Sequence, residues 1–75
     1  MGYLELTRLS DNKLFLFSDV DKLNVVFEDG SNREYSGNEI DVLVAPDLRI
    51  ASFIIHDSGS MYRFNSSDVM ITATS

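Results

Sequence analysis

The sequence predicts a mainly β fold built from hairpins, either a small barrel or a meander of three hairpins, with at most one short helix near residues 37–45. In residues 23–28, Leu23, Val25 and Phe27 alternate with Asn24, Val26 and Glu28, which is the period of a half-buried strand, and residues 48–56 also read as a strand. A turn sequence follows each of these segments. Asp29-Gly30 supplies the positive φ of a tight hairpin turn, and Asp57-Ser58-Gly59-Ser60 is expected to form another turn.

The expected strands follow one another along the chain and are separated by turns. Residues 3–9 and 13–17 form the first expected hairpin. We expect residues 18–21 to connect it to the central hairpin, whose turn is Asp29-Gly30. A third hairpin is expected over residues 48–64, followed by a last strand at residues 69–73. Repeated hairpins of this length favour an SH3-like barrel or a twisted meander.

Residues 36–44 are compatible with two local structures. Ser36 and Glu39 have the S-x-x-E spacing of a capping box, in which the glutamate carboxylate reaches back to the start of a helix. Ile40 and two further apolar residues follow at i, i+3 and i+4, which is the spacing of one helix face. The same apolar residues are also good strand formers. One short helical turn is the favoured interpretation, and Pro46 ends either structure.

Length and composition limit the protein to a single domain of residues 1–75. A chain this short buries only about 60% of its unfolded surface, so its core is marginal. It contains no cysteine, which excludes disulfide and thiolate chemistry and suggests a reducing compartment. Its first residues lack the apolar stretch of a signal peptide, and no apolar run approaches the ~20 residues of a membrane span. We expect a cytoplasmic protein that does not contact membranes.

The negative charge of the chain is concentrated in its centre. The net charge is −6, and residues 19–47 hold eight acidic residues against only Lys22 and Arg33, whereas the charges of the remaining residues cancel. Such a segment should repel nucleic acid and attract basic proteins; the alternative is a charge that only maintains solubility. The predicted partner-binding residues are Asp19, Asp21, Glu28, Asp29, Glu34, Glu39 and Asp41.

The segment KLFLF at residues 13–17 is apolar on both faces of its expected strand. Leu14 and Leu16 lie on one face, and Phe15 and Phe17 lie on the other. A small β domain has one core and can cover only one of these faces. We therefore expect either the leucine pair or the phenylalanine pair to pack against a second copy in a two-fold homodimer.

No motif in the sequence indicates catalysis, a metal site or a cofactor. His56-Asp57-Ser58 contains the residue types of a hydrolase triad, but a triad converges from separate elements, and these residues are consecutive in a turn. His56 is the only histidine, and the carboxylates at residues 19–21 lack the glycine and closing glutamate of a calcium loop. The eight aromatic residues lack the basic groove of a nucleic-acid-binding platform.

Two segments resemble a known family. LELTRLSDNKLFLFSDVDKL at residues 4–23 and VVFEDGSNREYSGNEIDVLV at residues 25–44 are similar to the small FlbD-type flagellar or swarming-motility proteins. This chain lacks the family's spacer between the two halves and adds a third hairpin. The resemblance implies a structural or assembly component, in a flagellum or by extension in a virion, and it implies no catalytic residue.

In size and charge, the chain also resembles small phage-encoded proteins that disable host nucleic-acid-binding proteins by imitating DNA. Carboxylates spaced along a rigid sheet can replace phosphates on a basic surface. We therefore expect a non-catalytic acidic binding protein. The most specific version of this hypothesis is a DNA-mimicking inhibitor of a basic DNA-binding protein in the cytoplasm. The assembly component is the alternative.

Overall fold

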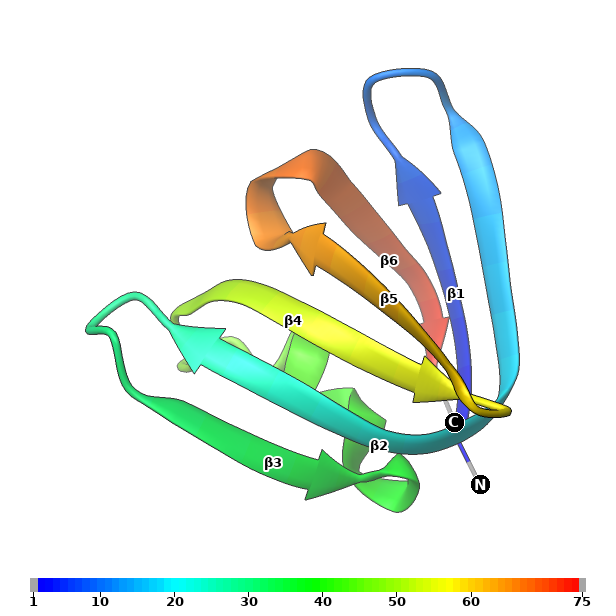
Figure 1. The fold of residues 1–75 in the computed structure, drawn as a ribbon. Coiled ribbons are helices and arrows are strands. Elements are labelled where there is room, and N and C mark those ends of the chain that lie inside the picture. The colour runs from blue at the N-terminus through cyan, green and yellow to red at the C-terminus, as the bar shows by residue number, and fades with distance from the viewer. Residues whose placement is uncertain (1, 75) are drawn as a thin grey trace.

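The computed structural model describes residues 2–74 and confirms a mainly β fold (Figure 1). Six strands and two short 3-10 helices make up the domain. Their bounds are β1 Gly2–Arg8, β2 Lys13–Phe27, β3 Asn32–Ser36, η1 Gly37–Val44, β4 Ile50–Asp57, β5 Ser60–Asn65, η2 Ser66–Asp68 and β6 Val69–Thr74. All strand pairs are antiparallel, and the three predicted hairpins are present as β1–β2, β2–β3 and β4–β5.

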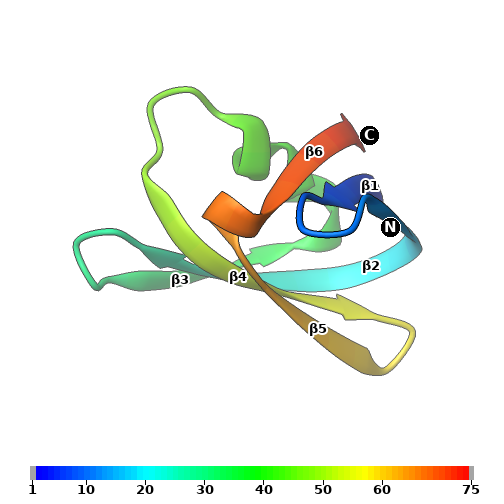
Figure 2. The same ribbon diagram turned by 90° about the horizontal axis from the view of Figure 1, so that it is seen from above.

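The six strands form one bent sheet that is not closed into a barrel. Its main path runs β5-β4-β2-β1-β6, and β3 adds to β2 outside this path. The sheet also contains pairings beyond those of successive strands, because β4 pairs with β2 and β6 pairs with β1, which lies at the other end of the chain. Figure 2 shows the bend: β6 and η1 lie on one side of β4, and β5 lies on the other.

Strand β2 is longer than predicted because it continues through residues 18–21, where we expected a connection. The register with β1 shifts there, from Leu4 opposite Phe17 to Gly2 opposite Val20. The extra residue in β2 forms a β-bulge, which bends a strand without ending it. The polar residues of this segment therefore mark a bend, and the prediction of a separate connection is wrong.

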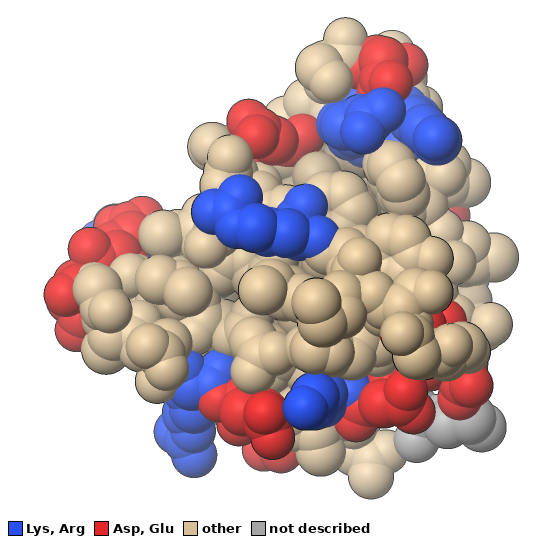
Figure 3. Space-filling view, in the orientation of Figure 1, with Lys and Arg blue, Asp and Glu red and all other residues tan. Residues whose placement is uncertain are grey.

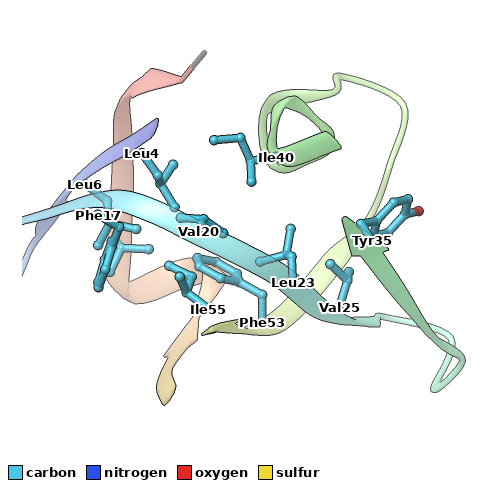
Figure 4. Packing of buried hydrophobic residues seen from close by; sticks show 11 residues of the cluster. Leu4, Leu6, Phe17, Val20, Leu23, Val25, Tyr35, Ile40, Phe53 and Ile55 are labelled. Carbon is cyan, nitrogen blue, oxygen red and sulfur yellow. The ribbon is translucent and has the colours of Figure 1, made fainter. Parts of the chain in front are cut away.

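The core fills the concave side of this bend. Alternate residues of the strands point inward, as Leu4 and Leu6 do from β1, and Figure 4 shows Ile40 of η1 pointing towards Leu4 and Val20. The buried hydrophobic residues are Leu4, Leu6, Phe17, Val20, Leu23, Val25, Tyr35, Ile40, Phe53, Ile55 and Val69.

Helix η1 confirms the predicted short helix and covers one end of the core. The Glu39 carboxylate accepts hydrogen bonds from the backbone N–H and the hydroxyl of Ser36, each at 3.1 Å, as the capping-box spacing predicts. Gly37 is buried against the bend of β2, where a Cβ atom would lie 1.9 Å from the backbone oxygen of Val20. Only glycine allows η1 to lie this close to the backbone of β2, and nothing in the sequence around Gly37 indicates this requirement.

The two predicted glycine turns are confirmed. Gly30 has φ 90° at the β2–β3 turn, and Gly59 has φ 84° at the β4–β5 turn. Ser58, the residue before Gly59, also has a positive φ of 50°. Two consecutive positive φ values are typical of the type I′ turns that match the twist of paired strands.

Candidate acidic interaction surface

The seven predicted partner-binding acids occupy three places on the fold. Asp19 and Asp21 lie at the bend of β2, and Glu28 and Asp29 lie at the β2–β3 turn. The other three follow in β3 and η1. Figure 3 shows carboxylates at the hairpin end on the left and along the lower edge, with basic side chains interleaved at that edge. The acids therefore form an interrupted rim instead of one continuous patch.

Three carboxylates of this rim are exposed and make no hydrogen bond or ion pair with other residues of the range 2–74. They belong to Asp21, Glu28 and Asp41. Asp29 lies beside Glu28, and the Ser31 hydroxyl and backbone N–H donate to its Oδ1 at 2.6 and 2.9 Å. Both donors hold the pKa of the Asp29 carboxyl below its ordinary value. The Asp29 carboxylate is thus held at the tip of the hairpin by two hydrogen bonds.

Glu34 belongs to a polar network on the outer face of β2, β3 and β4. Its Oε1 lies 3.7 Å from Lys22 Nζ and accepts a long hydrogen bond of 3.4 Å from Asn24 Nδ2. The Asn24 Oδ1 lies 2.5 Å from His56 Nε2. The charge of Glu34 is therefore partly balanced within the chain, and this network was not predicted because its members come from three strands.

Two of the predicted acids also support the fold. Asp19 Oδ2 accepts a hydrogen bond of 2.9 Å from the Ser58 hydroxyl, and the Asp19 backbone N–H donates to Asp57 Oδ2 at 3.1 Å. These bonds connect the bend of β2 to the β4–β5 turn. Glu39 caps η1 through Ser36. A partner would therefore meet these two carboxylates already held in place.

The hairpin tip also borders a hollow that sequence reasoning missed. Phe27, Glu28, Asp29 and Arg49 line it, and its volume is about 300 Å³. The Glu28 backbone N–H donates to the Arg49 carbonyl at 2.8 Å, which fixes the tip against the residue that precedes β4. The hollow therefore brings one basic residue, Arg49, next to the two acids at the hairpin tip.

The segment predicted as a dimer interface has two different faces. Phe17 is 5% exposed in the core, and Phe15 packs edge-on against Phe64 with ring centroids 5.2 Å apart. Leu14 and Leu16 point outward and are 56% and 59% exposed. Of the two predicted alternatives, only the leucine pair is free to meet a second copy.

The side chains of His56, Asp57 and Ser58 do not converge. His56 contacts Asn24, whereas Asp57 and Ser58 both bond to Asp19. Among residues 2–74, no group of three histidine, aspartate or glutamate residues is placed to hold a metal ion. The rim of acids and the exposed Leu14 and Leu16 are therefore the surface features on which a function can be proposed.

Comparison with known proteins found no relative: no family model matches the chain, and no curated protein or solved structure is significantly similar to it. Within the part of the chain that the structure describes, neither helix is long and apolar enough to cross a membrane. Function must therefore be argued from the charge and geometry of the surface.

Proposed function

We propose that this chain is a non-catalytic acidic binding protein that occupies the basic surface of a DNA-binding protein, as a DNA-mimicking inhibitor does. The observation that carries the proposal is the separation of charge. The whole net charge of −6 belongs to residues 19–47, which run from the bend of β2 to the loop after η1. In Figure 3, basic side chains lie both on the upper part of the face and along its lower edge, between the carboxylates.

The acids that are not used within the domain provide the proposed contacts. Asp21, Glu28 and Asp41 are exposed and unpaired within residues 2–74, and beside Glu28 the Asp29 carboxylate is held in place by Ser31. Strand pairing and the packing of η1 on the core hold these groups at fixed separations. Fixed carboxylates can replace phosphates opposite arginine and lysine side chains without the entropy cost of ordering a flexible acidic tail.

The proposed setting is the cytoplasm, or the host cytoplasm if the protein is phage-encoded, because DNA-binding proteins are available there. A chain without cysteine is compatible with that reducing compartment. A homodimer would double the number of carboxylates offered to the partner. Attraction between exposed charges is screened by salt, so affinity for the partner should fall steeply as ionic strength rises.

Capture from a bacterial lysate at about 50 and 200 mM salt, with and without competing duplex DNA, tests the proposal. We expect a basic DNA-binding protein to be captured at low salt and displaced by the duplex. Asp21→Asn/Glu28→Gln/Asp41→Asn removes three unpaired carboxylates and should weaken capture about tenfold or more.

The matched control removes the same charge from outside the acidic segment. Glu5→Gln/Asp11→Asn/Asp68→Asn should leave capture nearly unchanged, apart from the loss of general attraction. Equal binding by both triple variants would show that the acidic rim only solubilises the domain. Capture of flagellar or virion components in place of a DNA-binding protein would favour an assembly role.

A further inference from the structure

The first half of β2 has an edge without a strand partner. Residues 13–17 pair with β1 on one side, whereas pairing with β4 begins only at Val20 opposite Asp57. Strand β3 joins β2 later still, at Lys22. Figure 1 shows this half of β2, in light blue, at the rim of the molecule with no strand beyond it. Among the described residues, the backbone groups along this edge meet no other strand.

Between Lys13 and the β-bulge that follows Phe17, this edge lacks the features that usually block strand addition. Residues 14–17 contain no charge, proline or glycine, and more than half of each leucine side chain is exposed. Natural proteins normally protect such an edge with charges, a proline, a bulge or a covering segment. Here the charges stand only at the two ends, with Lys13 before the apolar residues and Asp19 after them.

We propose that a second copy of the chain occupies this edge, through antiparallel pairing of residues 14–18 about a two-fold axis at Leu16, which leaves the bond of the Asp19 backbone N–H to Asp57 Oδ2 in place. In this register Leu16 faces Leu16 of the second copy, and Leu14 faces its Ser18. Phe15 faces its Phe17 on the inner side. Lys13 comes within reach of Asp19 of the second copy, and the symmetry axis generates the same pair twice.

Charge complementarity favours a second copy of the chain as the partner of this edge, and it favours the register centred on Leu16. Opposite charges directly across a strand pair stabilise it, and like charges destabilise it. Centring the pairing on Phe15 would place Lys13 opposite Phe17 and lose both ion pairs. Asp19 retains its second carboxylate oxygen for this contact, because Ser58 bonds only to Oδ2. A two-fold axis also brings the exposed leucines of both copies together on the outer face, where neither copy covers them alone.

The inference does not depend on the proposed function, because its test uses the purified chain alone. Light scattering over a wide concentration range should give twice the chain mass for the wild type. Leu16→Lys would place two ammonium groups at the axis and should leave only monomer. Met70→Lys is the matched control, since Met70 is 54% exposed but lies in β6, beyond β1 from the proposed edge, and this variant should remain dimeric.

A charge exchange tests the register. Lys13→Glu and Asp19→Lys should each weaken the homodimer about tenfold or more, because each variant places like charges opposite each other twice. Mixing the two variants should restore a dimer, since both pairs are then complementary. Thermal unfolding of each variant confirms that it folds. A monomeric wild type, a dimer that survives Leu16→Lys, or a mixture that stays monomeric would overturn the proposal.

Discussion

Replacing Gly37 by alanine should destabilise the domain more than any other single-methyl addition at a described glycine. The added Cβ would lie 1.9 Å from the Val20 oxygen and 2.9 Å from its carbonyl carbon, compared with 3.4 Å for ordinary contact. The backbone of η1 and the bend of β2 would have to separate by about 1.5 Å to relieve the overlap. Neither is a flexible side chain that could simply rotate away.

The expected loss can be estimated from two effects. Overpacking in a well-packed region costs about 1–3 kcal/mol, and here backbone must move, so the upper end applies. Moving η1 would also loosen Ile40, which is fully buried, and part of its burial energy of about 1.5–3 kcal/mol would be lost. We expect Gly37→Ala to lower the free energy of unfolding by about 3–5 kcal/mol, from a total of about 4–11 kcal/mol for a chain of this length.

Urea unfolding followed by circular dichroism measures this loss as a lower transition midpoint at unchanged slope. Gly59→Ala is the matched control, because no atom lies within 4 Å of its added Cβ and only the positive φ is unfavourable. That variant should lose about 1 kcal/mol. If Gly37→Ala unfolds at the wild-type midpoint, η1 does not approach the bend of β2 as closely as described here, and the reasoning fails.

Three further changes have defined outcomes. Gly30→Val should lower the free energy of unfolding by about 1–3 kcal/mol, because valine strongly disfavours positive φ, and an unchanged melting temperature would contradict the turn. The guanidinium of Arg8 donates hydrogen bonds to the carboxylate of Asp11 and lowers the pKa of that carboxyl from 3.8 to about 2. Because the pKa of Asp11 is lower in the folded state, the ionised carboxylate stabilises the fold above pH 4, and this stabilisation is lost as the pH falls towards 2. An NMR titration of Asp11 with a midpoint near 4 would argue against the ion pair. Ile40→Ala should cost about 2–5 kcal/mol in chemical denaturation, whereas Leu14→Ala should change the free energy of unfolding of the monomer by less than about 0.5 kcal/mol.

The turns and the short helix could be predicted because local chemistry decides them. A glycine at Gly30 or Gly59 allows the positive φ that the turn requires, whatever the rest of the fold does. The spacing of Ser36 and Glu39 likewise indicates the start of η1. These features involve residues within a few positions of one another, so the sequence order already contains the geometry.

The bend of β2 could not be predicted because distant partners decide it. Residues 18–21 have the composition of a turn, yet Gly2 and Asp57 pair with Val20 and keep the strand continuous. Distant residues also decide which face of residues 13–17 is buried, since Phe64 of β5 packs against Phe15. The sequence shows where the acids lie along the chain. Their distribution over three places along the rim of the fold follows from the bend of β2.

The bent strand β2 also determines how the domain can come apart. Strands β1, β3 and β4 all hydrogen-bond directly to β2, while β5 and β6 are each attached through a strand that does. Loss of β2 would leave β3 without a partner and would separate the pair β1–β6 from the pair β4–β5. An isolated pair of strands is marginally stable in water, so we expect both pairs to unfold together with β2. Long-range pairs such as Leu4 with Thr74 close almost the whole chain, so we expect this small protein to fold slowly for its size.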